Sequence, residues 1–225
     1  LNNLFTQLIL KTTTDSKFYI KIAKLIPDLL ERKDILISFS DNSVQKAFSA
    51  NGYGGEYKDS RVSNTKNIND FLYINEANIG ANKVNAYISR EVTYEAMLEQ
   101  GRVASKAKLR LTNTSHIDGY KVYIKFAVPK GSILKEISIN GVKQQTTSAV
   151  TDFRIYEARN FKKSEKLEVE QYTKDNFTYF AFVTEVLKAE KADIEITYDN
   201  GVSKPLSTIV DYSLLYIKQP GTKPY

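Results

Sequence analysis

The chain has 225 residues, of which 42% are hydrophobic and 26% are charged, with a mean hydropathy of −0.37. This length suffices for one large or two modest domains, and the apolar share is too high for a disordered chain. Because the sequence contains 0 cysteines and 1 histidine, disulfides, thiolate metal sites, cysteine nucleophiles and most histidine chemistry are excluded. We therefore expect no metal and no cofactor. No stretch approaches the roughly 20 apolar residues that span a membrane.

The chain is basic, with 32 Lys and Arg against 26 Asp and Glu, a net charge of +6 and a pI of about 9.2. The densest basic run is interspersed with acidic residues (Arg159, Lys162, Lys163, Glu165, Lys166, Glu168 and Glu170). Nucleic-acid binders instead gather positive charge and aromatic rings on one face, so we expect no nucleic-acid partner. We interpret the run as a solvated loop between strands, and the alternative is a weak attraction to an anionic envelope polymer or membrane surface.

Helical spacing dominates the first 30 residues. One apolar stripe comprises Leu4, Phe5, Leu8 and Ile9, and a second, after a polar break, comprises Tyr19, Ile22, Ala23 and Ile26. Either Asp15 or Ser16 suits the N-cap of the second helix, because its side-chain oxygen can accept the free amides of the first turn. We expect Pro27 to start a separate short turn rather than lie inside that helix.

The next segment predicts a strand followed by a helix. Residues 34–39 form a short, nearly continuous apolar run, which is typical of a strand covered on both faces. Asp41 is placed to cap a helix that Gly52 ends. A polar loop and a second short strand, at 71–74, follow. Residues 1–80 therefore predict the C-terminal portion of an α/β domain whose other strands lie upstream.

Beyond Ala81 the apolar residues recur at every second position, the period of a β-strand. The alternation inverts around residues 99–101, so a three-residue turn there brings the apolar faces of two strands into register and pairs Leu98 with Val103. Asn140-Gly141 predicts a second hairpin turn, because both residues tolerate positive φ.

Further strands follow at short, regular spacing. Their alternating residues lie at 120–128, 133–139, 153–155, 167–169, 177–183, 192–198 and 212–216, with turns between them that include Asp199-Asn-Gly201. Because no helix-length stripe interrupts the series, residues 81–225 predict an antiparallel, immunoglobulin-like β-sandwich. The expected fold class is α+β, with an N-terminal α/β remnant before this sandwich.

Several short runs carry a family likeness. They are Lys33-Asp-Ile-Leu-Ile37, Gly52-Tyr-Gly-Gly55, Asp70-Phe-Leu-Tyr-Ile-Asn-Glu-Ala-Asn-Ile-Gly-Ala-Asn-Lys-Val-Asn-Ala-Tyr87, Phe126-Ala-Val-Pro-Lys-Gly131 and Tyr216-Ile-Lys-Gln-Pro-Gly221. In these runs, which together span nearly the whole chain, the sequence resembles a bacterial family catalogued as domain-of-unknown-function family 4012. The Asn-x-Gly-x-x-Lys-x-x-x-Tyr run and the terminal Lys-Gln-Pro-Gly are the most specific pieces.

The resemblance implies a setting rather than a reaction. Members of this family look like envelope proteins with a short cytoplasmic start, one membrane helix and a large extracytoplasmic region that ends in a segment like this one. The resemblance therefore implies a location at the bacterial cell surface, with membrane attachment only through an anchor outside this chain. No established activity carries over from the family.

Few side chains suggest catalysis. His116 lies between Ser115 and Asp118, but residues of one turn do not converge as a catalytic triad does, so we interpret the segment as a turn. Three acidic residues are candidates for glycoside hydrolysis, which needs two carboxylates about 5–10 Å apart; they are Asp59, Asp70 and Glu76. Solvated carboxylates are the alternative interpretation.

The segment before the long strands carries the candidate binding residues, Asn75, Asn78, Asn82, Lys83 and Tyr87. The amides either bind a polar ligand such as a glycan or satisfy backbone groups in an irregular connection, and Lys83 suits an anionic group. Tyrosines, Tyr53 and Tyr57 among them, form a sugar-stacking surface or are ordinary strand residues. Arg90 interrupts an apolar face, so it must find a carboxylate or a sheet edge.

We therefore expect a non-catalytic, extracytoplasmic module of a cell-envelope protein that binds envelope glycopolymer or another surface protein. The alternative is an accessory part of an envelope-polymer-modifying enzyme whose catalytic residues lie upstream, by analogy with LytR–CpsA–Psr transferases. A catalytic chain predicts a pocket with several convergent titratable groups. A binding module predicts an exposed sheet edge or a tyrosine patch.

Overall fold

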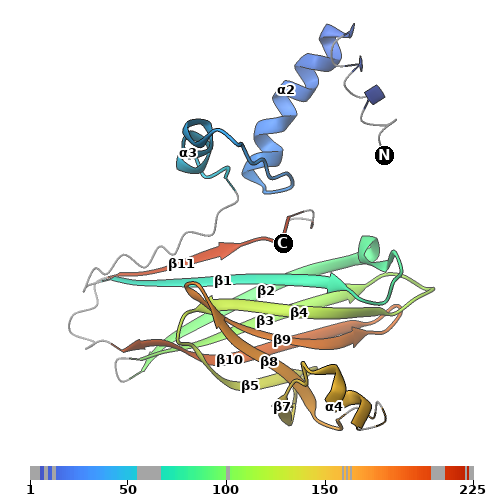
Figure 1. The fold of residues 1–225 in the computed structure, drawn as a ribbon, viewed down its shortest axis with the longest axis vertical. Helices are drawn as coiled ribbons and strands as arrows, with labels where there is room; N and C mark the ends of the chain where they lie inside the picture. The colour runs from blue at the N-terminus through green and yellow to red at the C-terminus, as the bar shows by residue number, and fades with distance from the viewer. Residues whose placement is uncertain are drawn as a thin grey trace. The chain divides into compact units, whose positions relative to one another are not determined.

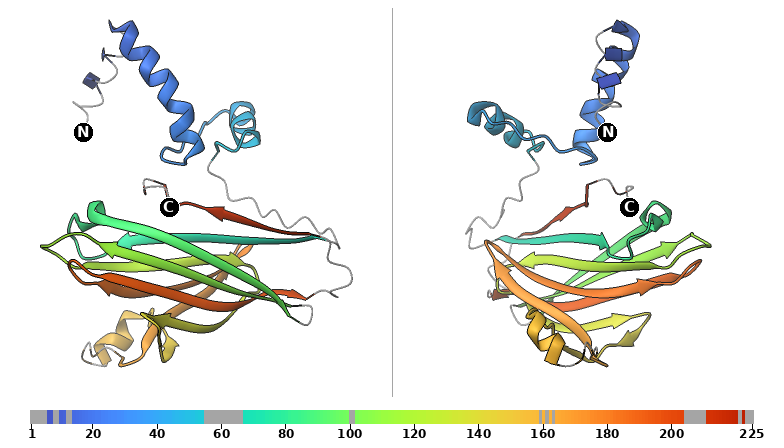
Figure 2. Two further views of the ribbon diagram at one scale, coloured as in Figure 1. Left: turned by 180° about the vertical axis from the view of Figure 1, so that it is seen from behind. Right: turned by 45° about the vertical axis from the view of Figure 1, so that its right-hand side comes forward.

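The computed structural model describes residues 6–7, 10–11, 14–54, 67–99, 102–158, 160, 162, 164–203, 211–220 and 222. The fold is α+β and mostly β, with two sheets that contain antiparallel strands and with few helices (Figure 1, Figure 2). The chain forms two compact units, one of residues 1–58 with 218–224 and one of residues 59–217. This division differs from the predicted boundary at residue 80, because the strand predicted at 71–74 belongs to β1 (Asn67–Asn78), which pairs within the second unit.

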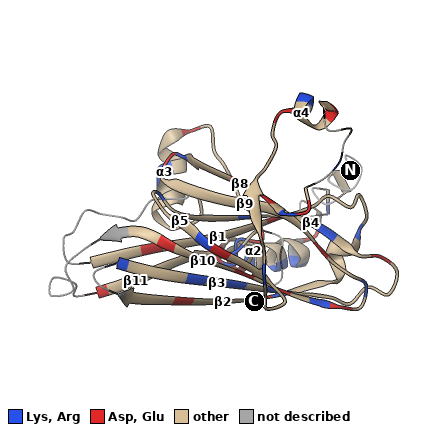
Figure 3. Ribbon diagram, turned by 90° about the horizontal axis from the view of Figure 1, so that it is seen from below, with Lys and Arg blue, Asp and Glu red and all other residues tan. Residues whose placement is uncertain are grey.

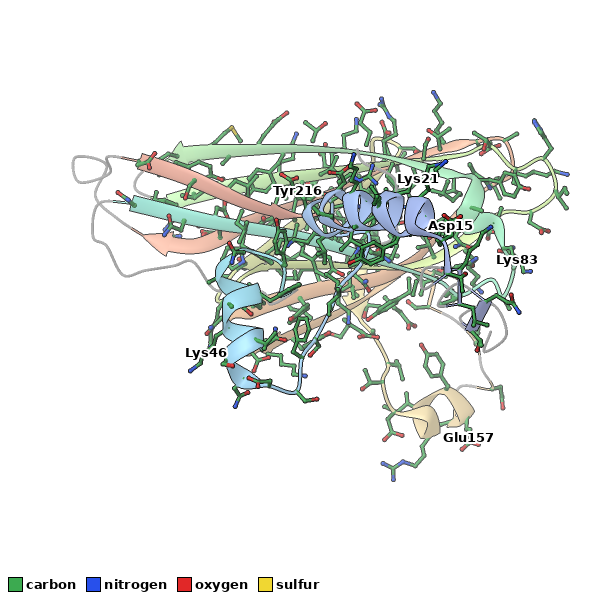
Figure 4. The ribbon with its side chains drawn as sticks, turned by 90° about the horizontal axis from the view of Figure 1, so that it is seen from above. Asp15, Lys21, Lys46, Lys83, Glu157 and Tyr216 are labelled. Atoms are coloured by element: carbon green, nitrogen blue, oxygen red, sulfur yellow. The ribbon has the colours of Figure 1, made fainter. Side chains whose placement is uncertain are left out.

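Two helices, α2 (Ser16–Glu31) and α3 (Asn42–Ala50), are described in the first unit. Asp15, labelled in Figure 4 at the start of α2, accepts hydrogen bonds from two backbone N–H groups of the first turn at 3.0 and 3.2 Å. This confirms one of the two predicted N-caps. Asp41 caps α3 in the same way, and Gly52 follows the end of α3 with a φ of +77°, both as predicted.

Two predictions for this unit are wrong. Pro27 lies inside α2 instead of starting a separate turn. A proline has no backbone N–H, so it costs the helix one hydrogen bond. Because α2 ends at Glu31, soon after Pro27, the helix tolerates this loss. Residues 34–39, predicted as a strand, lie between α2 and α3 and form none. The described part of this unit offers no second strand to pair with them, and an isolated strand leaves its N–H and C=O groups without protein partners.

The described residues after β11 (Asp211–Ile217) belong to the first unit. Lys218 Nζ donates to Asp34 Oδ1 at 2.8 Å and to the carbonyl oxygen of Thr222 at 2.6 Å. The hydrogen bond from Lys218 holds the pKa of the Asp34 carboxyl below its ordinary value. The terminal Lys-Gln-Pro run thus has a structural use, because it ties the end of the chain to the segment after α2.

The first sheet of the second unit has six strands in the order β11-β1-β4-β9-β8-β7. Besides β1 and β11, its strands are β4 (Tyr120–Pro129), β7 (Thr146–Ser148), β8 (Leu167–Lys174) and β9 (Phe177–Val186). β1 pairs with β11, and β7 with β8, in parallel. The predicted antiparallel arrangement is confirmed for β1 with β4, β4 with β9 and β9 with β8. It is wrong for the two parallel pairs, because parallel neighbours are joined by long connections that leave no turn signal in the sequence.

The second sheet has five strands in the order β2-β3-β10-β5-β6. They are β2 (Ile88–Glu99), β3 (Arg102–Asn113), β5 (Ile133–Ile139), β6 (Val142–Lys143) and β10 (Lys191–Ser203). β2 and β3 pair Leu98 with Val103 as predicted, and the pairing continues one residue further on each side. Residues 100–101 of the predicted turn lie outside the described residues. Asn140 and Gly141 join β5 to β6 with φ of 53° and 76°, the conformation of the predicted hairpin turn.

Two further segments differ from prediction. Residues 153–155, predicted as a strand, lie in the short helix α4 (Phe153–Ala158). The turn predicted at 199–201 lies within β10, whose register is irregular there. Gly201 has a φ of +75°, and a Cβ at this position would lie 2.8 Å from the carbonyl oxygen of Gly131. The glycine therefore serves the close approach of two backbones rather than a chain reversal.

One hydrophobic core lies between the two sheets. Its buried residues come from both of them, for example Leu72, Phe126 and Phe180 from the six-stranded sheet and Leu109 and Ile194 from the five-stranded sheet. Because successive side chains of a strand point to opposite sides, the intervening residues lie on the two outer faces of the unit. These outer faces differ in chemistry, and the difference locates the candidate site.

Candidate functional site

The predicted binding residues between Asn75 and Tyr87 are divided among three places. Asn75 lies within β1, on the outer face of the six-stranded sheet, and its Nδ2 donates to Tyr73 Oη at 3.3 Å. Lys83 and Tyr87 are exposed at the two ends of the short helix η1 (Val84–Tyr87). Figure 4 shows Lys83 pointing away from the strands.

Asn78 and Asn82 together stabilise the turn that leaves β1. Asn78 Nδ2 donates to the carbonyl oxygen of Asn82 at 2.7 Å, and Asn78 Oδ1 accepts from the N–H of Gly80 at 3.0 Å. Asn82 Nδ2 donates to the carbonyl oxygen of Gly119 at 3.2 Å, and its Oδ1 accepts from the N–H of Val84 at 3.3 Å. These amides satisfy backbone groups of an irregular connection, which is one of the two interpretations of the sequence. Ligand binding at this turn stays a prediction.

Two of the three candidate carboxylates share the inner face of β1 but lie far apart. Asp70 and Glu76 are 1% and 6% exposed. Their separation of six residues corresponds to about 20 Å along a strand. Glycosidase carboxylates lie about 5–10 Å apart, so these two form no such pair. Asp59 lies outside the described residues.

Asp70 is the centre of a hydrogen-bond network in the core. Its Oδ2 accepts from the hydroxyls of Tyr94 at 2.5 Å, Tyr212 at 2.8 Å and Ser105 at 3.4 Å. Tyr198 Oη lies 3.2 Å from Tyr94 Oη. Burial, and then neighbouring tyrosine and Asp70 groups, raise the pKa of all three tyrosines, so they remain hydroxyl donors. The network joins β1 and β11 to the five-stranded sheet.

Glu76 belongs to a second buried network. Arg90 Nε donates to Glu76 Oε1 at 2.8 Å, and the two side chains are 8% and 1% exposed. Tyr120 Oη donates to Glu76 Oε2 at 3.2 Å. Burial first, and the charge of Glu76 second, raise the pKa of Tyr120 to about 12. The prediction of an ion pair or an edge position for Arg90 is confirmed, because β2 is also the edge strand of its sheet.

His116 is exposed in the loop before β4. Ser115 Oγ accepts hydrogen bonds from the backbone N–H groups of Ile117 and Asp118 at 3.2 and 3.3 Å, which is the predicted turn interaction. Among the described residues, no three acidic or histidine side chains gather to hold a metal ion. None of the described helices is long and apolar enough to cross a membrane.

The outer face of the five-stranded sheet is a ladder of paired charges. Lys108 and Arg110 of β3 lie 2.9 and 2.6 Å from Asp193 of β10, and Lys106 lies 3.5 Å from Glu195. Figure 3 shows blue segments on β3 and red segments on β10. The hydrogen bond from Arg110 holds the pKa of Asp193 far below its ordinary value. Charges that neutralise one another in this way make an ordinary solvated surface.

The outer face of the six-stranded sheet instead carries aromatic rings. Tyr172 of β8 and Tyr179 of β9 stack, with ring centroids 4.8 Å apart and 17° between the ring planes. Tyr123 of β4 donates its hydroxyl to Glu170 Oε2 at 2.9 Å. Tyr172 is 37% exposed, and the other two rings are partly exposed. Tyr123, Lys125, Tyr172 and Tyr179 are called the tyrosine–lysine cluster below.

Lys125 lies at the centre of this cluster. Its Nζ is 5.8 Å from the ring centroid of Tyr123, 5.8 Å from that of Tyr172 and 5.7 Å from that of Tyr179. These distances are within the range of cation–π attraction. Among the described residues, no carboxylate forms an ion pair with Lys125. Burial, followed by the neighbouring Tyr172, raises the pKa of Tyr179, so its ring stays neutral beside the cation.

The strand register explains why these side chains meet. Lys125 lies opposite Ala181 of β9, and Ala127 lies opposite Tyr179, which in turn lies opposite Tyr172. The two alanines are short and buried, so they leave room above the sheet for the lysine chain and the tyrosine rings to converge. The cluster borders an apolar group on the same face, formed by Phe71, Ala127 and Phe177 with Tyr73, Tyr179 and Ile217 packed against it.

A shallow hollow adjoins the cluster where the edge of β8 becomes free. In the described structure β7 pairs with β8 only as far as Val169. The hollow has a volume of about 550 Å³. Its polar lining residues are Thr146, Thr147, Ser148, Thr151, Glu170, Gln171 and Tyr172, and its apolar ones are Leu134, Ala149 and Val169. This volume is within the range of small-molecule sites, about 300–1,000 Å³. Tyr172 thus belongs both to the cluster and to the wall of a hydroxyl-rich hollow.

The tyrosines on the outer face of the six-stranded sheet were not predicted, because the wrong set of alternate residues of β9 was assigned to the core. The spacing at 177–183 predicts that Tyr179 belongs to the apolar face of the strand. The structure instead buries Phe180 and Phe182 in the core and places Tyr179 outside. The available signal was that β9 is apolar on both faces, which is typical of a strand that is covered on both sides.

No protein-family model matches the chain, and no curated protein sequence matches it. The resemblance to family 4012 therefore stays a prediction. The functional argument rests on geometry, which leaves the tyrosine–lysine cluster and its hollow available to a ligand while the buried carboxylates are engaged in packing.

Proposed function

We propose that the chain is a non-catalytic, extracytoplasmic module of a bacterial cell-envelope protein and that it binds envelope glycopolymer. The observation that carries this proposal is the tyrosine–lysine cluster beside the hydroxyl-rich hollow at the edge of β8. A tyrosine ring offers a flat apolar surface with one polar end. Sugar rings have apolar C–H faces and hydroxyl edges, so stacking on tyrosine combined with hydrogen bonds from threonine, serine and glutamine suits them.

The positions of the acidic residues and the histidine support binding rather than catalysis. Asp70 and Glu76 lie in separate buried networks, and His116 is exposed in a turn. General acid–base chemistry needs such groups close to one another and within reach of a substrate. In the described part of this chain Asp70 and Glu76 instead join strands, through hydrogen bonds with Tyr212 and Arg90.

The cell-surface location and the immunoglobulin-like character of the second unit belong to the same proposal. The location is supported by the family resemblance of the sequence, and the fold character by two sheets of mostly antiparallel strands around one core. A sheet face is a broad, rigid surface on which several rings from different strands keep fixed spacing, and an extended polymer can lie across it.

The test is co-sedimentation of the full chain with insoluble bacterial cell walls. We expect the wild type to sediment with the walls and the double variant Tyr172→Ala/Tyr179→Ala to remain mostly in solution. Tyr87→Ala is the matched control, because Tyr87 is 56% exposed and lies outside the cluster. Far-ultraviolet circular dichroism shows whether each variant is folded.

The outcomes separate the site from the function. If the double variant sediments with the walls as the wild type does, the tyrosine–lysine cluster is not the binding site. If only Tyr87→Ala loses binding, the binding site lies at the turn after β1. If the wild type is not retained by any wall fraction, the proposed function is wrong.

A further inference from the structure

We propose that the tyrosine–lysine cluster selects acidic glycans, with Lys125 binding a carboxylate or phosphate group of a sugar that stacks on Tyr172. This inference deepens the proposed function and rests on it. It names the class of polymer, and it assigns the residue that distinguishes a charged sugar chain from a neutral one.

The first argument is the position of the Lys125 ammonium. Three ring centroids lie 5.7–5.8 Å from it, so the cation is held in place by cation–π attraction rather than left to sample the solvent. No described carboxylate pairs with it. The basic residues on the opposite outer face, Lys106, Lys108 and Arg110, are already paired with Asp193 or Glu195. Lys125 therefore offers a fixed positive charge that no carboxylate among the described residues neutralises.

The second argument is the placement of Tyr172 beside that charge. The Tyr172 ring stacks on Tyr179, which fixes its plane, and it is 37% exposed. A sugar stacked on the exposed part of this ring brings its substituents close to the Lys125 ammonium. Stacking and charge pairing then act on one sugar unit, and an acidic substituent accepts a hydrogen bond between two opposite charges, whereas a neutral substituent brings no charge of its own.

The third argument is the hollow next to Tyr172. Its lining includes Thr146, Ser148, Thr151 and Gln171, residue types that suit the hydroxyl groups of the next unit of a sugar chain. A free strand edge also suits an added peptide strand, whose alternate side chains need apolar pockets. The lining has the apolar residues Leu134, Ala149 and Val169, but residues that carry a hydroxyl outnumber them, which favours a glycan.

Glu170 is a second charged residue whose substitution tests the role of Lys125. It lies in the same cross-strand row as Lys125, separated from it by Ala181, and its Oε2 accepts from the Tyr123 hydroxyl. The charge of Glu170 repels an acidic ligand, whereas the charge of Lys125 attracts one. Lys125→Gln and Glu170→Gln therefore change the local charge in opposite directions at almost the same place.

The experiment measures binding of the full chain by isothermal titration calorimetry to two polymers with the same sugar backbone, the charged polygalacturonate and its neutral methyl ester. Poly(glycerol phosphate) is the third ligand and distinguishes a phosphate from a carboxylate. We expect the wild type to bind an acidic polymer about tenfold more tightly than the neutral ester, the size of one hydrogen bond to a charged group. Lys125→Gln should abolish this preference, and Glu170→Gln should increase it.

The matched control is Lys106→Gln, which removes the same charge from the opposite outer face and should keep the preference. Equal affinity of the wild type for acidic and neutral polymers, or a preference unchanged by Lys125→Gln, overturns the inference while glycan binding stands. A preference lost equally in Lys106→Gln also overturns it, because net charge alone would then explain the effect.

Two further outcomes complete the test. Tighter binding to anionic lipid vesicles or to an acidic peptide than to any glycan overturns the inference. Absence of glycan binding by the wild type overturns it together with the proposed function. If Lys125→Gln does not fold, Glu170→Gln keeps the test decisive, since it leaves Lys125 in place and must still strengthen binding to the acidic polymer.

Discussion

Replacement of Arg90 by methionine measures how far one buried ion pair holds the two sheets together. Arg90 lies on β2 and Glu76 on β1, their side chains are 8% and 1% exposed, and Nε lies 2.8 Å from Oε1. Arg90→Met leaves the Glu76 carboxylate in the core, where the hydroxyl of Tyr120 is a remaining donor. Loss of one partner of a buried pair costs about 3–5 kcal/mol. We expect the free energy of unfolding of the second unit to fall by that amount.

The double variant Arg90→Met/Glu76→Met removes both charges. Apolar replacement of a whole buried pair is often neutral, so the double variant should recover most of the stability that the single variant loses. The recovery should stop short by about 1–3 kcal/mol, because the Tyr120 hydroxyl then lacks this acceptor. Arg110→Met is the matched control on the outer face, where the Arg110 side chain is 40% exposed and the expected loss is below about 1 kcal/mol.

The assay is urea unfolding followed by the far-ultraviolet circular dichroism of the β-sheet, with the free energy extrapolated to zero urea. A double-variant cycle over the wild type, Arg90→Met, Glu76→Met and the double variant isolates the interaction between the two side chains. The reasoning is refuted if Arg90→Met is as stable as Arg110→Met, or if the double variant is less stable than Arg90→Met alone.

Gly201→Ala should destabilise the second unit more than Gly141→Ala, because both glycines have positive φ but only Gly201 places a new Cβ within 2.8 Å of a neighbouring carbonyl oxygen; the urea midpoints of the two variants give the comparison. The hydrogen bond from Arg110 lowers the pKa of Asp193, so the stability that this carboxylate contributes is present above its ordinary pKa of about 4 and is lost as the pH falls further. Asp193→Asn should therefore flatten the acid limb of stability against pH. Burial raises the pKa of Tyr198, so the contribution of its protonated hydroxyl is present below about pH 10 and is lost as the pH rises through the folded pKa. Ultraviolet absorbance of tyrosinate should show that Tyr198 ionises only when the fold is lost.

Local patterns predicted the features that depend on neighbouring residues. The register of β2 and β3 follows from one apolar face that continues through a short turn, and Leu98 pairs with Val103 as that pattern requires. The caps at Asp15 and Asp41 follow from side-chain oxygens placed just before apolar helical stripes. Both kinds of feature are determined within about a dozen residues of the chain.

Pairings between distant segments were not predictable from such patterns. β11 joins β1 in parallel, so that the hydroxyl of Tyr212 reaches Asp70, which precedes it by 142 residues. Local sequence patterns predict both strands but not their partners or their direction. Residues 34–39 show the converse, because their apolar run is typical of a buried strand although the described part of their unit contains no strand for them to join.

The candidate site was not predictable either, because it too depends on pairings between distant segments. Lys125, Tyr172 and Tyr179 come from β4, β8 and β9 and meet only through the register of three strands, so no window of sequence contains them together. The asparagines of the turn after β1 are conspicuous in the sequence. Asn78 and Asn82, however, turn their amides to the backbone, because an irregular connection has N–H and C=O groups that a regular strand would have paired.

The two outer faces of the second unit indicate what kind of ligand completes it. On the outer face of the five-stranded sheet, Asp193 neutralises Lys108 and Arg110. A surface with paired charges of this kind needs no ligand. The six-stranded sheet shows partly exposed rings around Lys125, which has no described counter-ion, and exposed apolar patches of this kind mark interaction sites. A ligand that covers Tyr172 and also neutralises Lys125 must combine an apolar face with a negative charge. A neutral sugar chain meets the first requirement and an inorganic anion the second, whereas a sugar chain with acidic substituents meets both.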